Sequence, residues 1–490
     1  MVAEEKKASA KRWLVFGASG YIGSNLVPRL LAGDIAVRAT ARRLDVLEAR
    51  GWRGAELAVA DALDRDSLTD VLSDVDVAYY LVHSMSAGRD FGRLDLQAAE
   101  NFAAAASDAG VKRIIYLGGL VPEAADSEHI CSRRDTGEAL RQGRVPVTEL
   151  RAGIIVGPGS AAFEVMRDLV FHLPVMVTPR WVRAKSPPIA LENLLDYLVR
   201  LPLVEAAANR IFDAAGPETL TYEEMMRILA GVAGRRSPWI LPVPVLSPQL
   251  SSYWLKYITS VPTSIARALI GGLKHDFEAD TGPLQEMIPL NLLDFRQSVE
   301  AAFAAERAST VEARWVEGAF AMRKRRIDYA YYAKRASGNA VANASSGAVW
   351  SIVSRIGGDN RYYYLNSLWT LRELLDTLAG GHGLHHGRRD PETLRVGDKV
   401  DSWEVIGLEP NRRLTLAFGM RAPGSGVLEF TIDSLPNERS RLTATAYWHP
   451  AGVLGLAYWY SLEPFHRVIF QGMTREICRR AEAPNRGQFT

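Results

Sequence analysis

Three glycines near the N-terminus have the spacing that a phosphate-binding turn requires. Gly17, Gly20 and Gly23 form a G-x-x-G-x-x-G pattern within the stretch Trp13–Gly23. In such a pattern the first glycine permits a tight turn, the second lets the backbone approach a pyrophosphate, and the third lets helix and strand pack closely. We therefore predict a dinucleotide-binding turn here, the alternative being an ordinary tight turn between a strand and a helix.

The residues on either side of the turn predict the elements that position it. Trp13–Phe16 is an uninterrupted apolar run, which is typical of a buried parallel strand. Ser24–Leu31 has apolar residues at a helical spacing. The first turn of that helix offers free N–H groups and the positive end of the helix dipole to an anion. Ser19, Tyr21 and Ile22 lie between the glycines, so we include them among the residues that contact the cofactor.

The second predicted strand, Ile35–Arg43, indicates which dinucleotide binds. An NAD site usually has an Asp or Glu at this strand end for the ribose 2′-hydroxyl, but no acidic residue occurs before Leu44. Arg38, Arg42 and Arg43 are present instead, and a guanidinium suits a 2′-phosphate. The pattern favours NADP, with NAD as the alternative cofactor and a solvated strand edge as the alternative role of the arginines. Arg42 is the first choice because it lies at the strand end, whereas Arg38 is expected to point away.

Strands and helices alternate through the first 160 residues or so, which predicts an α/β fold with a doubly wound parallel sheet. Five of the six expected strands are Trp13–Phe16, Ile35–Arg43, Leu57–Ala60, Asp76–Met85 and Lys112–Leu120, and the sixth lies within Val145–Gly159.

Composition limits the classes of protein to which the chain can belong. At 490 residues it should hold more than one domain, and a net charge of +2 argues against a dedicated nucleic-acid binder. Cys131 and Cys478 are far apart, which fits a reducing cytoplasm and predicts neither a disulfide framework nor a metal site. Residues 1–10 and 484–490 are expected to be tails. No stretch is long and uncharged enough to span a membrane.

The second half of the chain changes in pattern. Residues 11–337 are assigned to the dinucleotide-binding domain, with about 160–337 covering the substrate. The small, polar residues 338–348 predict a linker, and 349–483 a separate domain in which alternating strands precede a long helix at Gly455–Ala481. The apolar, aromatic stretch Pro238–Ile258 is most simply buried, and alternatively lines a lipophilic pocket or touches a membrane surface. The sequence does not predict the oligomeric state.

Several of these motifs together resemble one family. The glycine turn, "YYLVHSM", "IIYLGGL" and "LRAGIIVGPGS" look like an atypical short-chain dehydrogenase/reductase, in the bacterial subgroup that carries a C-terminal domain of unknown function. The resemblance implies that Asp61 and Ala62 meet the adenine, and that Leu81, Val82 and His83 lie along the cofactor ribose. The C-terminal domain resembles the helix-grip fold of START and polyketide-cyclase-like domains, which commonly encloses an apolar cavity.

The resemblance also points to the catalytic positions, where this chain departs from the family. The family uses a Ser, a Tyr and a Lys, but Gly118 and Gly119 stand at the expected Ser position, His129 at the Tyr and Arg133 at the Lys. His129 can still exchange a proton near neutral pH, and Arg133 can bind ribose but cannot act as a base. The alternative for His129 is a surface histidine at a helix start.

Two functions follow from this departure. The first is an NADP(H)-dependent oxidoreductase acting on a small lipophilic carbonyl or a quinone-like molecule, with His129 and Arg133 as substitute catalytic residues. The second is a non-catalytic dinucleotide-binding redox sensor or ligand-binding protein, because the Ser, Tyr and Lys are absent.

Overall fold

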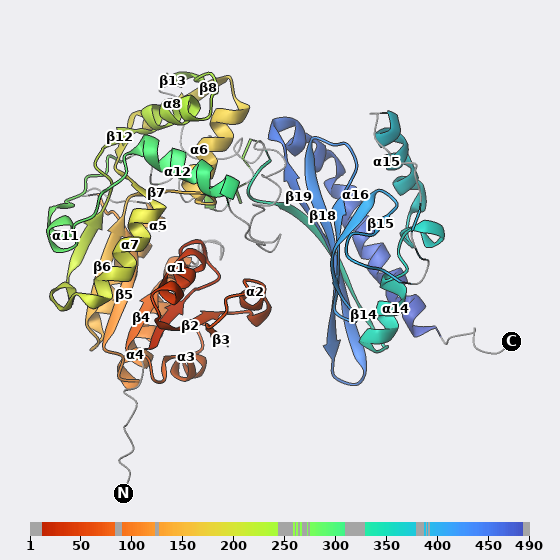
Figure 1. Ribbon diagram of the computed structural model, residues 1–490, viewed down its shortest axis with the longest axis horizontal. Coiled ribbons are helices and arrows are strands. Elements are labelled where there is room, and N and C mark those ends of the chain that lie inside the picture. The colour runs from red at the N-terminus through yellow and green to blue at the C-terminus, as the bar shows by residue number, and fades with distance from the viewer. Residues whose placement is uncertain are drawn as a thin grey trace, which may run out of the picture. The chain divides into compact units, whose positions relative to one another are not determined.

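The chain divides into two compact units, Met1–Arg314 and Trp315–Thr490 (Figure 1). The structure is a computed structural model. It describes residues 12–83, 91–122, 127–243, 258–259, 261–262, 265–266, 272, 275–308, 329–378, 387–388, 390 and 393–483. Both expected tails, 1–10 and 484–490, lie outside the described residues, as does most of the apolar stretch after residue 243. None of the described helices combines the length and apolarity that crossing a bilayer requires.

The first unit is built on a parallel sheet of seven described strands, in the order β11-β6-β5-β4-β1-β2-β3. The predicted doubly wound α/β fold is confirmed. The strand order reverses at β1, which lies between β2 and β4, and ligands of such sheets bind outside the carboxyl ends of the strands at this point. The strands are β1 (Arg12–Phe16), β2 (Ala36–Ala41), β3 (Glu56–Val59), β4 (Val77–Tyr80), β5 (Arg113–Gly119), β6 (Val147–Ala152) and β11 (Ile211–Ala214).

Helices cover both faces of this sheet, and the sequence of β1 shows why. Trp13 and Val15 enter one apolar cluster, with α1 and α7, while Leu14 and Phe16 enter another, with α3, α4 and α5. Successive side chains of a strand point to opposite faces, so a strand buried on both faces needs an uninterrupted apolar run. The covering helices are α1 (Tyr21–Ala32), α2 (Leu44–Glu48), α3 (Arg65–Leu72), α4 (Phe91–Asp108), α5 (Glu128–Gln142) and α7 (Leu191–Arg200).

Most of the rest of the first unit packs around a further apolar cluster, although Ile189 and Leu284 join the cluster that holds Trp13 and Val15. Its strands form two-stranded pairs: β7 (Ile154–Val156) with β10 (Pro188–Ala190), β8 (Val175–Pro179) with β13 (Trp239–Val243), and β9 (Lys185–Ser186) with β12 (Leu220–Thr221). Its helices are α6 (Ala161–His172), α8 (Tyr222–Val232), α11 (Gly282–Met287) and α12 (Phe295–Ala308).

The second unit is an antiparallel sheet with a long C-terminal helix, α16 (Gly452–Glu482), packed on β14 and β19. Its six described strands lie in the order β14-β19-β18-β17-β16-β15. They are β14 (Lys334–Ala342), β15 (Lys399–Val400), β16 (Trp403–Glu409), β17 (Arg413–Phe418), β18 (Gly424–Leu435) and β19 (Arg439–Pro450), and α14 (Ser346–Val353) and α15 (Asn366–Leu378) complete the unit. This is the expected sheet and helix, while the likeness to START domains stays a prediction.

The linker predicted at residues 338–348 is wrong. These residues hold the end of β14, which pairs with β19 from Lys334↔Trp448 to Ala342↔Ser440, and the start of α14. A Cβ on Gly338 would lie 2.3 Å from the backbone of Phe470 in α16. The small residues of β14 thus let α16 approach the strand closely. A run of small residues is also typical of a flexible linker, so the sequence pattern does not distinguish the two. The second unit therefore includes β14 and does not begin at residue 349.

Candidate cofactor and active site

The glycine turn has the geometry that a phosphate cradle requires. Gly17 has φ +93°, in the left-handed region, and a Cβ there would lie 3.1 Å from the Val82 side chain. A Cβ on Gly23 would lie 2.5 Å from the Gly17 carbonyl oxygen. Larger residues at these two positions would therefore fill or push apart the turn. This fit supports a bound pyrophosphate next to the backbone.

The N-terminus of α1 is open to an anion. Its N-cap is Gly20, which provides no side-chain cap, and no acidic residue occurs in its first turn, which begins with Tyr21 and Ile22. The helix dipole is therefore not offset by a carboxylate of the helix itself. A cation also lies beside the turn, because the Arg50 Nη2 donates a hydrogen bond to the Ser19 carbonyl oxygen at 3.3 Å.

The three arginines expected near the adenosine ribose have different roles. Arg38 is buried and donates hydrogen bonds to Glu56 Oε1 at 2.9 Å and to two backbone carbonyl oxygens, so it is structural and points away as expected. Arg42 and Arg43 are exposed in the turn between β2 and α2. That turn follows the carboxyl end of a strand adjacent to β1, the position that a 2′-phosphate group occupies in this fold.

The predicted adenine residues follow β3 at the same edge of the sheet. Asp61 is exposed, and its Oδ1 accepts a hydrogen bond from the Leu63 N–H at 3.0 Å. Ala62 is buried, and its carbonyl oxygen accepts a hydrogen bond from Asn101 at 3.1 Å. These bonds fix the backbone at the strand end, and the contact of Asp61 and Ala62 with the adenine stays a prediction.

Three side chains form a hydrogen-bonded relay at the carboxyl end of β4. Leu81, Val82 and His83 follow this strand. His83 Nδ1 lies 2.5 Å from Asp95 Oδ2, and His83 Nε2 lies 3.0 Å from His129 Nδ1. Asp95, on α4, is only 2% exposed. The relay therefore runs from a buried carboxylate through His83 to His129 at the start of α5.

Burial sets the protonation of this relay. It lowers the pKa of His83, and together with the nearby charges of Arg133 and His83 it lowers the pKa of His129 to about 3. Both imidazoles are therefore neutral at pH 7. The Asp95 carboxylate holds the His83 proton on Nδ1, so His83 Nε2 accepts the hydrogen bond from His129 Nδ1–H. His129 Nε2 is then the outer end of the relay.

Arg133 explains why the Ser position is glycine. Its Nη2 donates a hydrogen bond to the Leu117 carbonyl oxygen at 2.7 Å, and a Cβ on Gly119 would lie 3.3 Å from Arg133 Nε. A Cβ on Gly118 would meet Glu149 Oε1 at the same distance. Side chains at these positions would press on charged groups already present, so the guanidinium occupies the space beside the end of β5.

No metal centre accompanies the relay in the part of the chain that the structure describes, where no group of three or more His, Cys, Asp or Glu side chains could hold an ion.

Comparisons with known proteins agree with the fold of the first unit. A family model described as NAD(P)H-binding matches residues 17–139. The (4-alkanoyl-5-oxo-2,5-dihydrofuran-3-yl)methyl phosphate reductase of Streptomyces griseus subsp. griseus is 30% identical over 231 residues, which cover 45% of this chain and 74% of that protein. The chain belongs to the NAD(P)H-binding family.

Other matches extend over parts of the chain. The 4-hydroxy-2-methyl-3-oxo-4-farnesyl-3,4-dihydroquinoline-1-oxide ketoreductase of Stigmatella aurantiaca is 29% identical over 196 residues, 38% of this chain and 54% of that protein. The solved triphenylmethane reductase of Citrobacter sp. shares the fold, with a TM-score of 0.50 at 21% identity over 60% of this chain and 99% of its own. Residues 326–473 match a family described as a protein of unknown function, DUF2867.

Two site residues of this NAD(P)H-binding protein were not predicted from its sequence. Arg50 follows the short helix α2, and nothing in its local pattern indicates that it reaches Ser19. Asp95 did leave a signal, because it lies on the buried stripe of α4 with Phe91, Ala98 and Phe102. A carboxylate on an apolar helical face needs a partner, and here the partners are His83 and the Ser132 hydroxyl, which donates at 2.9 Å.

Proposed function

We propose that the chain is an NADP(H)-dependent oxidoreductase of the atypical short-chain dehydrogenase/reductase type, which reduces a small lipophilic carbonyl or quinone-like substrate. The observation that carries this proposal is the Asp95–His83–His129 relay beside the glycine turn. It supplies a group that can transfer a proton at the position of the missing Tyr. Family membership supports the redox chemistry.

In this proposal the residues of the chain divide the work. The hydride would come from the nicotinamide ring of the dinucleotide held in this site. The turn at Gly17–Gly23 and the N-terminus of α1 bind the pyrophosphate, and Arg133 orients the ribose through its guanidinium. Protonated His129 donates the Nε2 proton to the substrate oxygen and keeps the Nδ1 proton toward His83. Asp95 stabilises the positive charge on the relay before transfer, and a proton from water restores it.

The cofactor preference rests on the basic residues at the strand edge. Arg42 and Arg43 are exposed beyond β2, where an acidic residue would favour NAD. Arg50 brings another guanidinium against the glycine turn. A 2′-phosphate can accept charged, forked hydrogen bonds from such groups, so we assign the site to NADP(H).

The substrate class is supported by apolar surface in the first unit and by the relatives. Trp239 and Leu241 of β13 are exposed beside their exposed cross-strand partners Val175 and Val177 of β8. This ribbon thus presents one apolar face. The relatives are named as reductases of a substituted dihydrofuran phosphate and of a farnesylated quinoline oxide. By analogy, we propose a lipophilic carbonyl or quinone-like substrate for this chain.

The test follows oxidation of NADPH by absorbance, with a panel of quinones, cyclic enones and aldehydes. We expect turnover with at least one substrate. His129→Ala should lower the rate by roughly 100-fold or more, because general acid catalysis contributes about 10²–10⁴-fold. Glu128→Gln, an exposed neighbour in the same helical turn, is the control and should keep the wild-type rate.

Two other outcomes would contradict the proposed function or the proposed role of His129. Tight NADPH binding without turnover of any substrate would favour the non-catalytic redox sensor, for which the lost Ser, Tyr and Lys are the specific observation. Turnover that survives in His129→Ala would remove His129 from the chemistry.

A further inference from the structure

An arginine of α15 lies among aromatic rings in the second unit. The guanidinium carbon of Arg372 is 4.7 Å from the centre of the Phe418 ring, 5.8 Å from that of Trp369 and 6.0 Å from that of Trp403. Trp403 and Phe418 are cross-strand partners on β16 and β17. The ring faces attract the cation, but they offer no acceptor for its N–H groups.

Polar atoms in this cluster lack partners. Arg372 Nε, Trp369 Nε1 and His466 Nδ1 are buried and make no hydrogen bond with the residues that the structure describes. Buried polar atoms of folded proteins are almost always paired, and each exception needs an explanation. Arg372 and His466 as whole residues are only half-buried, so the cluster is not sealed inside the unit.

His466, on α16, is a second polar group in the same part of the second unit, because its ring partners Trp459 and Phe470 belong to the apolar cluster that also holds Trp369, Trp403 and Phe418. Its ring centre lies 4.9 Å from that of Trp459 and 5.8 Å from that of Phe470. Burial, and then the charge of Arg372, lower the pKa of His466 to about 4. The guanidinium is thus the cationic group of this pair at neutral pH, and the neutral imidazole can donate one hydrogen bond.

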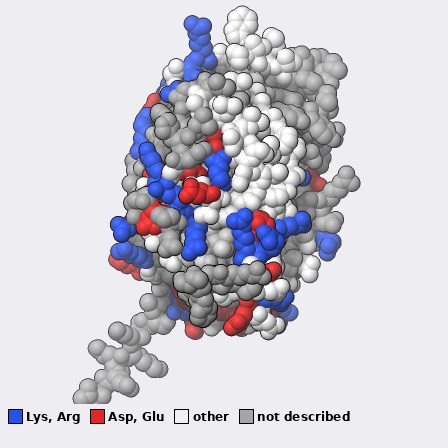
Figure 2. Space-filling view, turned by 90° about the vertical axis from the view of Figure 1, so that its right-hand side faces the viewer, with Lys and Arg blue, Asp and Glu red and all other residues white. Residues whose placement is uncertain are grey.

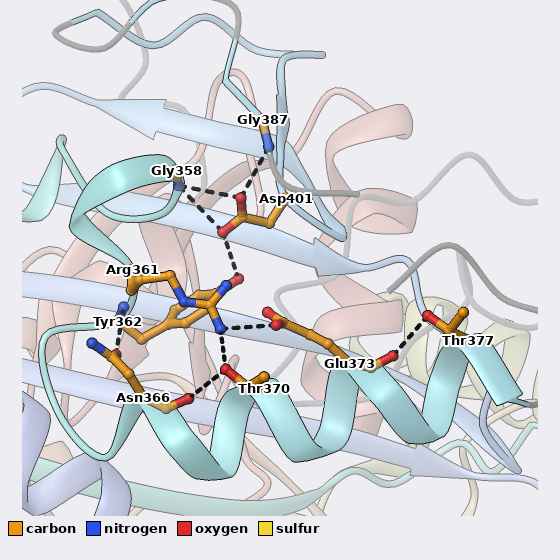
Figure 3. A network of polar contacts seen from close by, with 9 residues as sticks. All are labelled: Gly358, Arg361, Tyr362, Asn366, Thr370, Glu373, Thr377, Gly387 and Asp401. Carbon is orange, nitrogen blue, oxygen red and sulfur yellow. Dashed lines mark hydrogen bonds and ion pairs between the residues drawn. The ribbon is translucent and has the colours of Figure 1, made fainter. Parts of the chain in front are cut away.

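A strained segment fixes the helix that carries Arg372. Arg361, Tyr363 and Leu365 have φ of 53°, 64° and 48°, in the left-handed region that bulky residues seldom adopt. The Arg361 Nη2 donates to Thr370 Oγ1 at 2.9 Å and to Glu373 Oε2 at 2.8 Å, both on α15 (Figure 3). Such strain persists where the surroundings over-determine it, often next to ligand sites.

A second group of hydrogen bonds, made by Asp401 between β15 and β16, holds the same strained segment in place. Asp401 accepts hydrogen bonds from the Tyr362 hydroxyl at 3.1 Å and from the N–H groups of Gly358 and Gly387 (Figure 3). The Tyr362 ring stacks on Trp369 with the ring centres 4.3 Å apart. The segment therefore holds the Trp369 and Arg372 face of α15 in a fixed place.

Exposed apolar side chains occur on the two helices that carry these polar residues. Leu371 and Leu374 of α15 are 52% and 44% exposed, and Phe465 and Val468 of α16 are 53% and 55% exposed. Figure 2 views the molecule from the side on which α15 lies in Figure 1, and charged residues there gather over one half of the face while a broad area has none among the described residues. The two helices therefore carry exposed apolar side chains as well as the two polar groups.

We propose that Arg372 and His466 bind the carboxylate of an apolar small molecule, whose body packs on the neighbouring aromatic rings. The Nε–H and an adjacent Nη–H of Arg372 form a two-donor edge that matches the two oxygens of a carboxylate. His466 adds a neutral donor. This site lies wholly within the second unit and is independent of the redox function proposed for the first.

The test is calorimetric titration of the full chain with sodium 1-naphthoate, an aromatic carboxylate of small size. We expect the wild type to bind it at least tenfold more tightly than the neutral 1-naphthamide. Arg372→Gln should weaken naphthoate binding at least tenfold. Arg467→Gln, an exposed arginine on α16 that pairs with Glu463, should leave it unchanged.

NADPH binding, circular dichroism and a second variant distinguish loss of the proposed site from loss of folding. NADPH binding should be equal in all variants, because it belongs to the first unit. If Arg372→Gln alters the circular dichroism of the protein, His466→Phe provides the second test. This variant keeps an aromatic ring of similar size, so it should fold. It should weaken naphthoate binding at least threefold. No binding to the wild type, equal binding of naphthoate and naphthamide, or full affinity in the folded variants would overturn the proposal.

Discussion

At the scale of single residues, a histidine in place of a tyrosine changes how a proton can be supplied. A tyrosine needs its pKa lowered to act near neutrality, whereas the pKa of His129 already lies below its ordinary value of 6.5, at about 3. Such a group is a strong acid when protonated, but only a small fraction is protonated at pH 7. Of the neighbouring groups, Asp95 favours the charged form of His129, whereas burial and the charges of Arg133 and His83 oppose it.

This protonation predicts a pH dependence for the proposed reaction. Because the folded-state pKa of His129 lies well below 7, the protonated fraction rises tenfold for each unit by which the pH falls. We expect kcat/KM for reduction to rise as the pH falls from about 8 to about 5, without reaching a plateau. The measurement is the initial rate across this range, corrected for the stability of NADPH in acid. A flat profile would contradict proton donation by His129.

The buried carboxylate of the relay gives a separate prediction. Asp95→Asn removes the negative charge that stabilises a protonated relay, so kcat should fall roughly 10- to 100-fold, less than the roughly 10²–10⁴-fold that the proton-transferring group itself contributes. The dissociation constant of NADPH should stay unchanged, because Asp95 lies outside the glycine turn. Asp108→Asn, exposed on the same helix and paired with Arg65, is the matched control. An equal loss in both variants would indicate that α4 is merely destabilised.

At the scale of elements, local sequence patterns predicted the α/β fold and the glycine turn. The features that they did not predict depend on contacts between residues far apart in the sequence. The glycine spacing works as a local signal because turn, strand and helix are contiguous in sequence. Arg50 reaches Ser19 only after β2 and α2 have folded onto β1. The spacing between these two residues in the sequence therefore does not predict their contact. In β14 a composition of small residues arises from close helix packing, which no local pattern distinguishes from a linker.

The turn after β2 carries the prediction on cofactor choice. Arg38 is occupied by Glu56 and two backbone carbonyls, which leaves Arg42 as the exposed guanidinium directly after the strand. A charged hydrogen bond contributes about 1.5–3 kcal/mol, or roughly ten- to a hundredfold in affinity. Arg42→Ala should therefore weaken NADPH binding by at least about tenfold and NADH binding far less. Dissociation constants for both cofactors measure this.

A nearby arginine provides the comparison for Arg42. Arg53 is exposed beyond α2, and Arg53→Ala should change neither constant. If the Arg42 variant loses both cofactors equally, or if the wild type prefers NADH, the arginines are a solvated edge and the assignment to NADP is wrong.

At the scale of the whole molecule, the two units have separate cores and carry separate proposals. The first joins the parallel sheet to the relay, and the second joins the antiparallel sheet to the Arg372 cluster. Among the described residues, each of the four large apolar clusters draws its members from one unit. This separation predicts that the second unit folds alone, provided that its boundary includes β14.

Two fragments test that boundary. A fragment of residues 315–483 keeps β14, which pairs along its whole length with β19 and supports α16. A fragment of residues 349–483 lacks this strand, so it exposes the edge of β19 and leaves Phe470 and its neighbours on α16 without the surface they pack against. We expect the longer fragment to show a cooperative thermal transition by circular dichroism and the shorter one to show none. A cooperative transition in both would mean that β14 is dispensable, and its absence in both would mean that the second unit depends on the first for its stability.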